Sequence, residues 1–436
     1  MFKTLVNAFK QKEVRNKLLL TLLLLFIYCV GCWIPLPGID IQAFNEQIVG
    51  VDGEGGNSFL ALLSAISGGA LANCAILALG VSPYITASII IQLLTIAIPS
   101  LEKLSKEGGE EGRKKINYIT RWIALVLSFA QAIGIVVAFQ SLLNPDVLWA
   151  GASTFITGAM IVVMLTAGGM FTVWLGERIT DLGIGNGMSM LIFVGILSSA
   201  SSAILSAITG IGSDPNYIWN ILIFLVALLL VFVFIVFMDL SERRIPVQYA
   251  KQVKGRKMYG GQSTYIPVRL NNSGVMPIIF ANALIMFPQL ISSIFWPEST
   301  WYQNVLGTDS WAYIVLTALL ILFFAYFYAQ ISFNTDDISR RIQQNGGFIP
   351  GIRPGKPTTE YLKRISHRIT LFGAIFLSIV ALVPSLIFKG IDLASSQSLV
   401  GAFSATGLLI IVSVALDFEK RLDAQLMMRT YKGFLK

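Results

Sequence analysis

The run LLLTLLLLFIYCVGCWI, residues 18–34, decides the fold. It carries no charged residue, and Pro35 and Pro37 follow it at once. A helix of about 20 apolar residues rises about 30 Å, the thickness of the hydrocarbon core of a bilayer. Because the run lacks a small-residue cleavage site, we predict that it stays in the protein as a membrane helix and is not removed as a signal peptide.

Nine further apolar runs of similar length follow along the chain. Helices are expected for all of them, because backbone groups cannot remain unpaired in lipid. Composition agrees, since 55% of the residues are hydrophobic and 13% are charged. We therefore predict an all-α polytopic membrane protein. The ten predicted spans are residues 18–34, 74–98, 121–141, 153–175, 187–209, 217–238, 274–296, 311–332, 369–388 and 399–416.

Lys and Arg lie almost entirely on one side of these predicted spans. Of 32 such residues, 31 fall in the two terminal segments or in every second connection, and the exception is Lys389. Positively charged loops remain in the cytoplasm. We therefore predict a multi-pass protein of the cytoplasmic (inner) membrane with both termini in the cytoplasm.

A shorter apolar piece, residues 58–72, lies between the first two predicted spans. Its sequence, SFLALLSAISGGALA, is too short to cross the bilayer and contains Gly68-Gly69. Irregular backbone at membrane depth occurs only against protein or water. We therefore predict a re-entrant or interfacial helix that lines a cavity.

Proline occurs inside several predicted spans, at Pro83, Pro277, Pro288 and Pro384. Each proline removes a helical hydrogen bond and tends to kink the helix. Kinked helices suit a structure that opens, although proline is also common in membrane helices that do not move.

The predicted spans hold almost no ionisable residue, and their central polar residues, such as Thr86, Gln92, Gln131 and Asn282, are neutral. Ion-coupled transporters keep charged groups inside the membrane, so the pattern favours a passive, gated path. The spans also carry no Ser/His/Asp set, paired carboxylates or metal-spaced cluster. We therefore expect neither an enzyme, such as an intramembrane protease, nor a cofactor or metal.

Two connections on the cytoplasmic side, residues 239–272 and 333–368, are unusually long and basic. Clusters of Lys and Arg beside a membrane bind anionic lipids, which is one interpretation of these loops. They also mix turn residues with aromatic residues such as Tyr249, Phe348 and Tyr361. That mixture favours folded protrusions that are presented to a large partner.

Short motifs spread over nearly the whole chain resemble those of the SecY family, the central subunits of bacterial protein-conducting channels. They occur in the order in which the family has them, and an ordered set is far more specific than any one motif. The motifs are IPLPGI (34–39), SGGAL (67–71), ALGVSPYITASIIIQLL (78–94), WLGE (174–177), GIGNG (183–187), SERRI (241–245), YAK (249–251), GQST (261–264) and FIPGIRPG (348–355).

The resemblance implies two pseudo-symmetric five-helix halves, residues 1–210 and 211–436, with the pore at their interface. It also implies that the segment of about residues 58–72 is a short plug helix that blocks the pore from outside at rest. The plug residues that we predict are Phe59, Leu62, Leu63, Ile66, Gly68 and Gly69.

The resemblance further implies an hourglass pore that a ring of aliphatic side chains closes at its waist. A narrow apolar constriction gates by dewetting. Val81 and Met188 stand where relatives usually carry Ile, and the flexible Met side chain is expected to soften the ring. By matching motifs, the ring residues that we predict are Val81, Ile85, Met188, Ile192, Ile279 and Ile410.

We also predict a lateral gate, a seam to lipid formed by the second, third, seventh and eighth predicted spans. Neutral polar groups would hydrogen-bond across the closed seam, and such bonds in membranes contribute only about 0.6 kcal/mol on average. A signal sequence could therefore open the seam. The gate residues that we predict are Thr86, Gln131, Asn282 and Phe287.

The chain itself has no ATP-binding motif, so the energy for translocation must come from a partner. We expect that partner to dock on the basic loops. The resemblance implies a SecA motor ATPase or a ribosome as docking partners, SecE- and SecG-like small membrane subunits, preproteins with signal sequences, and anionic lipids. The docking residues that we predict are Arg243, Arg244, Lys254, Arg256, Lys257, Arg353 and Lys356.

The function expected from the resemblance is a channel that passes unfolded preproteins across the membrane and releases apolar segments sideways into lipid. A secondary transporter of a small solute is the alternative. The long basic loops and the scarcity of charges inside the predicted spans both favour the channel.

Overall fold

The structure is a computed structural model of the whole chain. It describes residues 2–39, 50–51, 54–55, 64, 67–106, 108–138, 154–183, 185–209, 217–249, 252–254, 257–259, 263–271, 274, 276–295, 310–390 and 405–433.

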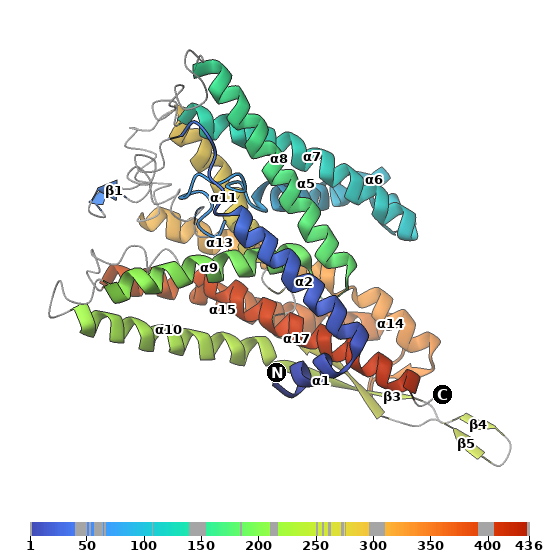
Figure 1. Ribbon diagram of the computed structural model, residues 1–436. Coiled ribbons are helices and arrows are strands. Elements are labelled where there is room, and N and C mark those ends of the chain that lie inside the picture. Colours follow the sequence, from blue (N-terminus) through green and yellow to red (C-terminus); the bar gives the residue numbers. More distant parts are fainter. Residues whose placement is uncertain are drawn as a thin grey trace.

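Long helices make up most of the described structure (Figure 1). Each predicted span overlaps one of them, which confirms a helical, polytopic architecture. By length and composition alone, four described helices are apolar enough to cross a membrane, or five if a bent pair counts as one span. The exact number of spans therefore stays a prediction. The overlapping helices are α2 (Lys12–Gly31), α5 (Ser82–Ala97), α7 (Gly109–Ala138), α8 (Thr154–Asp181), α9 (Gly187–Thr209), α10 (Tyr217–Leu240), α11 (Met276–Phe295), α13 (Trp311–Ser332), α15 (Lys356–Gly390) and α17 (Ala405–Gly433).

Small residues on helix α8 let its neighbours come close. Gly158, Gly168, Gly169 and Gly176 lie among its buried residues. A Cβ atom on Gly168 would overlap the carbonyl oxygen of Ile76, and one on Gly169 would come within 2.7 Å of the Ser128 hydroxyl on α7. The glycines on this helix are therefore required for packing.

The second predicted span, residues 74–98, is not one straight helix. Residues 67–81 form turns, α5 begins only at Ser82, and a bend of 106° separates α5 from α6 (Pro99–Lys106). Cys74 and Gly80 have φ values of +46° and +53°, which a right-handed helix does not admit. Pro83 lies in the first turn of α5, where proline displaces no hydrogen bond. Pro83 therefore begins the helix. The kink that we had expected at this proline does not form.

Backbone hydrogen bonds hold these turns against the end of α2. The amide of Leu36 donates to the carbonyl of Cys74 at 2.7 Å, and the amide of Ile76 donates to the carbonyl of Ile34 at 3.0 Å. On the other side, the hydroxyl of Thr172 in α8 donates to the carbonyl of Gly80 at 2.7 Å. The segment that leads into α5 is thereby fixed from both sides.

The predicted all-α class misses a small β structure in the long basic loops. In a three-stranded sheet, β3 (Glu242–Tyr249) pairs antiparallel with β6 (Ser263–Arg269) and with the short β7 (Gly347–Phe348). Isolated pairs are formed by β4 (Gln252–Lys254) with β5 (Lys257–Tyr259) and by β1 (Gly50–Val51) with β2 (Glu54–Gly55).

Alternation along β3 explains why this sheet forms. Ile245 and Val247 point inward and are 2% and 0% exposed, whereas Arg244 and Pro246 are exposed. The inward residues share a core with Ile342 of α14 (Thr335–Gln344) and with Leu362 of α15. One apolar face with period 2 is the pattern of a half-buried strand.

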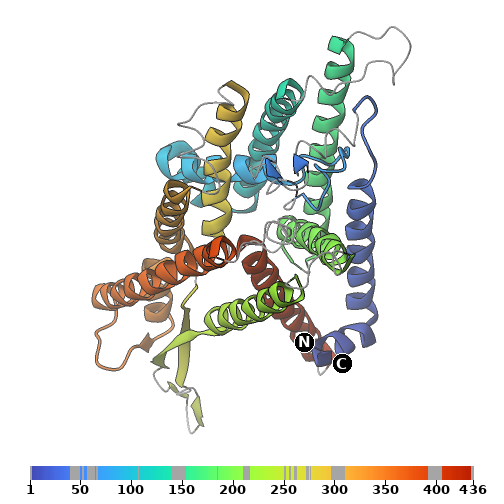
Figure 2. The ribbon, with the colours of Figure 1, turned by 90° about the vertical axis from the view of Figure 1, so that its left-hand side faces the viewer.

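Both chain ends and the basic loops lie at one end of the molecule. In Figure 1 the C label, α14 and strands β3–β5 lie in the lower right, and the N label lies beside them in the lower middle. Figure 2 shows the strands extending past the helices on the side where the two termini lie. Helix α1 (Phe2–Lys10) is tied to this end, since Ala8 packs in the same cluster as Leu422 and Leu426 of α17.

Candidate functional site

All six predicted ring residues meet in one apolar cluster. Val81, Met188, Ile192 and Ile410 are buried in it, between 4% and 8% exposed, and Ile85 and Ile279 pack against it. They come from the turn before α5 and from α5, α9, α11 and α17. Residues that are far apart in the sequence thus share one apolar cluster in the interior of the protein.

The turn before α9 sets the position of Met188. The amide of Gly187 donates to the hydroxyl of Thr180 at 2.9 Å, and the amide of Met188 donates to the side-chain oxygen of Asn186 at 3.1 Å. A Cβ atom on Gly176 would overlap the sulfur of Met188. The motif GIGNG is therefore a helix start that fixes Met188 against Gly176 of α8.

The predicted plug can be followed only at its C-terminal end. Phe59, Leu62, Leu63 and Ile66 lie outside the described residues. Gly68 and Gly69 are described, and both have positive φ values, +75° and +80°.

This end of the plug segment is anchored on α2 and α9. The hydroxyl of Tyr28 and the thiol of Cys32 donate to the carbonyl of Ser67 at 3.4 and 3.7 Å. A Cβ atom on Gly68 would lie 2.9 Å from the Cα of Gly195. Since Gly195 is less than one turn from the ring residue Ile192, the segment ends directly beside the ring.

Across the predicted seam, α11 packs against α5 and α7, and on its other side it packs against α13. One predicted detail is wrong: the hydroxyl of Thr86 donates to the carbonyl of Ser82 at 3.1 Å, within its own helix and not across the seam. Gln131 is buried, and its side-chain oxygen has no hydrogen-bond partner in the described part of the chain. Asn282 is half-buried, and the side chain of Phe287 lies outside the described residues.

Two of the predicted docking arginines, Arg243 and Arg244, are exposed on β3. The guanidinium of Arg244 pairs with the carboxylate of Glu242 at 2.8 Å and lies 4.8 Å from the ring centre of Tyr265. The hydrogen bond to Glu242 and the neighbouring Tyr265 raise the pKa of Arg244 further above its ordinary value. Lys254 belongs to β4 and Lys257 to β5, but the structure describes only their backbone. Arg256 lies outside the described residues.

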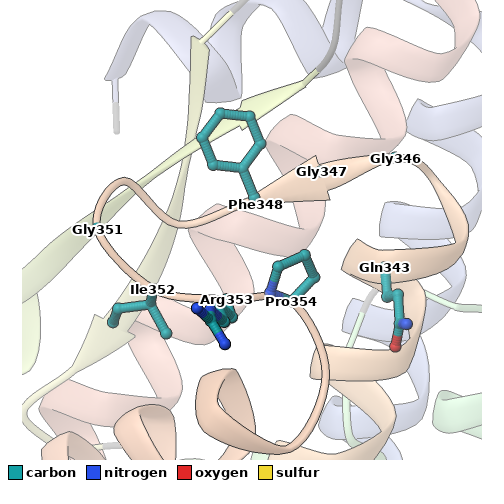
Figure 3. Close-up of a pocket in the computed structure, with 8 residues that line it drawn as sticks. All are labelled: Gln343, Gly346, Gly347, Phe348, Gly351, Ile352, Arg353 and Pro354. Atoms are coloured by element: carbon teal, nitrogen blue, oxygen red, sulfur yellow. The ribbon is translucent and has the colours of Figure 1, made fainter.

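Arg353 occupies a tight loop that leads into α15. It lines an open pocket of about 620 Å³ together with Phe348 and Pro354 (Figure 3). The hydroxyl of Thr358 donates to the carbonyl of Arg353 at 2.8 Å, and that of Ser339 donates to the carbonyl of Gly355 at 3.0 Å. The loop backbone is thus held while the guanidinium is exposed. Lys356, the last predicted docking residue, begins α15 and is exposed.

The model of the SecY family matches residues 75–419, which is most of the chain. The chain belongs to the SecY family. A relative from Streptomyces galbus is 42% identical over 452 residues, and one from Thermotoga maritima is 40% identical over 441 residues. The matches cover 100% of this chain and 100% and 98% of the relatives, and both relatives are called "Protein translocase subunit SecY".

Solved structures show the same fold at lower identity. The structure titled "The structure of a protein conducting channel" has a TM-score of 0.62 at 19% identity and covers 92% of this chain and 90% of that one. "Sec61 in the Canine ribosome-channel complex from the endoplasmic reticulum" has a TM-score of 0.58 at 17% identity and covers the same shares. As a SecY family member with several apolar helices, the chain is a multi-pass membrane protein.

Sequence reasoning missed an ion pair between two helices of the SecY fold. The guanidinium of Arg121 on α7 lies 2.6 Å from the carboxylate of Glu177 on α8. Glu177 belongs to the WLGE motif that the sequence analysis singled out, but we assigned no ion-pair partner to its carboxylate. Two opposite charges at the same end of neighbouring spans were the signal that could have found the pair.

Proposed function

We propose that this chain is the pore-forming subunit of a channel that conducts unfolded preproteins across the cytoplasmic membrane. The convergence of the six ring residues in one cluster is the observation that carries the proposal. Val81, Ile85, Met188 and Ile192 come from the first half of the chain, and Ile279 and Ile410 come from the second. A pore between two halves with an apolar waist stays dry and closed when empty. Aliphatic side chains can also pack around a passing chain of any sequence.

The channel is favoured over a small-solute transporter and over an enzyme. Membership of the SecY family supports a translocase subunit. The ring also offers a small ion or polar solute no coordinating group, because its members are all apolar. An energy source outside the chain is therefore part of the proposal, supplied by a SecA motor or a translating ribosome.

The orientation follows from charge. Both termini and the two long basic loops lie at one end of the molecule, and 31 of the 32 Lys and Arg residues fall in the terminal segments and in every second connection between the predicted spans. The positive-inside rule places it in the cytoplasm. There the exposed arginines meet SecA or the ribosome and anionic lipid headgroups, while SecE- and SecG-like subunits cover apolar helix faces within the membrane.

A crosslink at the ring tests the path. In a chain whose three native cysteines are replaced by Ala, Ile192→Cys is expected to crosslink to a secretory chain arrested in transit, because a chain in the pore must pass the ring. Leu197→Cys is the matched control, since Leu197 lies on the same helix and is 49% exposed, whereas Ile192 is buried. Equal crosslinking at both positions, or crosslinking at Leu197 alone, would refute the proposed path.

The lateral seam gives a second prediction. We propose that apolar segments leave between α5 and α7 on one side and α11 and α13 on the other. Gln131→Leu removes a buried oxygen that has no partner in the described structure, and an unpaired group of this kind costs about 1–3 kcal/mol. The substitution should therefore stabilise the closed seam. Weakly hydrophobic signal sequences should then be translocated several-fold less, while strongly hydrophobic ones are unaffected.

Thr86→Val is the matched control for the seam, because the Thr86 hydroxyl bonds within its own helix. Asn282→Leu is the second test variant and should act in the same direction as Gln131→Leu. The measurement is the translocation of one preprotein with a graded series of signal sequences. The quantity compared is the lowest signal-sequence hydrophobicity that still supports translocation. If it is unchanged in Gln131→Leu, or shifts as far in Thr86→Val, the assignment of Gln131 to the seam is contradicted.

A further inference from the structure

A second cavity lies beside the cytoplasmic ends of α13 and α15, away from the ring. Its volume is about 340 Å³, close to the lower end of the range of roughly 300–1,000 Å³ for small-molecule sites. The last turns of α13, the first residues of α14 and one face of α15 enclose it. We call it the α13–α15 pocket. It is lined by Tyr326, Ala329, Gln330, Phe333, Asn334, Thr335, Asp336, Thr359, Glu360, Lys363, Ser366, His367 and Thr370.

The α13–α15 pocket lies at the level of the lipid headgroups. On α13, Phe323 is 59% exposed one turn before Tyr326, and on α15, Phe372 is 66% exposed just after Thr370. These large apolar side chains require a hydrocarbon environment or a covering partner. Toward the cavity both helices become polar, since Gln330 lies about two turns after Phe323 and His367 and Arg368 lie about one turn before Phe372. The cavity therefore stands where lipid tails give way to headgroups.

Both signs of charge face this one cavity. Lys363 and His367 are four residues apart and therefore lie on the same face of α15. Asp336 on α14 and Glu360 on α15 supply two carboxylates. None of these four side chains forms an ion pair with another in the described structure, and Glu360 and Lys363 are exposed. Hydroxyls of Thr359 and Ser366 line the same cavity.

We propose that the α13–α15 pocket binds the headgroup of a zwitterionic phospholipid that carries a phosphate and a primary ammonium, a phosphatidylethanolamine. The phosphate would lie at Lys363 and His367, where a cation and hydroxyl donors are available. The ammonium would lie at Asp336 and Glu360. An anionic lipid without an ammonium leaves both carboxylates unpaired, and a choline headgroup has no N–H to donate to them.

Helix α14 connects the α13–α15 pocket to the loop of Arg353. Asn334 caps α14 by accepting from the amides of Asp336 and Asp337, so a headgroup at this end contacts the start of α14. The other end of α14 leads into the loop of Arg353, and Ser339 of α14 donates to the carbonyl of Gly355 at 3.0 Å. One short helix thus connects a lipid site with a partner-docking site.

Native mass spectrometry of the channel complex tests the proposal. The complex, purified with its small subunits, is exposed in turn to phosphatidylethanolamine, phosphatidylcholine and phosphatidylglycerol with identical acyl chains. We expect phosphatidylethanolamine to be retained about tenfold better than phosphatidylcholine, the size of one charge-assisted hydrogen bond. The double variant Asp336→Asn with Glu360→Gln should abolish that preference and raise the retention of phosphatidylglycerol. Lys363→Gln should lower the retention of both ethanolamine and glycerol lipids.

Matched controls are Arg364→Gln, at an exposed neighbour that does not line the cavity, and Glu111→Gln on α7, which should leave all three lipids unchanged. Equal retention of the three lipids by the wild type, or control variants that act like the pocket variants, would overturn the proposal. So would binding of soluble glycerophosphoethanolamine as tight as that of the lipid, which would indicate a site for a free phosphoester. Pocket variants that change SecA or ribosome affinity and leave lipid retention unchanged would assign the cavity to a protein partner and equally overturn it.

Discussion

Gly68→Val is expected to make the resting channel leak small ions while protein translocation continues. The φ value of Gly68 is +75°, and a Cβ atom there would lie 2.9 Å from the backbone of Gly195 on α9. A β-branched residue in this conformation is strained by about 1–3 kcal/mol, and every 1.4 kcal/mol changes a population about tenfold. The closed position of the proposed plug should therefore lose occupancy by about tenfold or more, and the leak should rise accordingly.

Gly109→Val is the matched control for this leak. Gly109 also has a positive φ, +53°, but a Cβ atom there would meet nothing within 4 Å. It introduces similar strain at the turn between α6 and α7 without touching α9. Deleting residues 60–70 should leak at least as much as Gly68→Val and should still export protein.

The measurements are ion conductance in planar bilayers and export of one preprotein into vesicles. A Gly68→Val channel as tight as the wild type would contradict the plug proposal, and so would a deletion that abolishes membrane insertion. A leak in Gly109→Val as large as that in Gly68→Val would also count against it, because the contact with Gly195 would then be irrelevant.

The helical architecture was predictable because its causes are local in the sequence. A run of apolar residues such as 18–34 needs no knowledge of its neighbours to be identified as a membrane helix, and Lys and Arg mark the cytoplasmic side independently of tertiary contacts. The start of α5 was not predictable in this way. Residues 74–81 are as apolar as the helix that follows, and tertiary hydrogen bonds with Ile34, Leu36 and Thr172 help to hold them in turns.

The ring was predictable only through motif resemblance. Buried Ile and Val are the ordinary content of any helix bundle, and nothing in the pattern around Ile410 separates it from Leu408 or Leu409, which are also buried. The motif order supplied the correspondence, and the structure then brought all six side chains together. Whether they close the pore remains a prediction.

Side-chain partners were the least predictable feature. Thr86 was assigned to the seam because it is polar, but a threonine hydroxyl in a helix can donate to the carbonyl four residues before it, as that of Thr86 does to Ser82. The strands were missed for a related reason. The charges of Arg243 and Arg244 dominated our interpretation of the loop, whereas the alternation of Ile245 and Val247 with exposed residues indicates a strand.

Arg353→Lys is expected to weaken motor-driven translocation although the positive charge is kept. Hydrogen bonds from Thr358 and Ser339 hold the backbone of the loop, so the guanidinium projects from a defined place beside Phe348 and Pro354. A planar guanidinium grips a carboxylate or phosphate through two parallel hydrogen bonds, which an ammonium cannot reproduce. Losing one charge-assisted hydrogen bond should weaken docking of SecA or the ribosome by about tenfold. Arg353→Glu, which also reverses the charge, should weaken it further.

Arg340→Lys is the matched control for this docking, because Arg340 is exposed on α14 in the same loop region but does not line the pocket of Arg353. The measurement is the translocation of one preprotein into vesicles, with partner affinity and passive ion leak recorded on the same preparation. If the loop only anchors the protein to anionic lipid, charge alone matters, and then Arg353→Lys would translocate like the wild type while Arg353→Glu would not. If Arg353 docks a partner, both substitutions reduce partner affinity, and Arg353→Glu reduces it more than Arg353→Lys. Expression, insertion and ion leak then remain at the wild-type level.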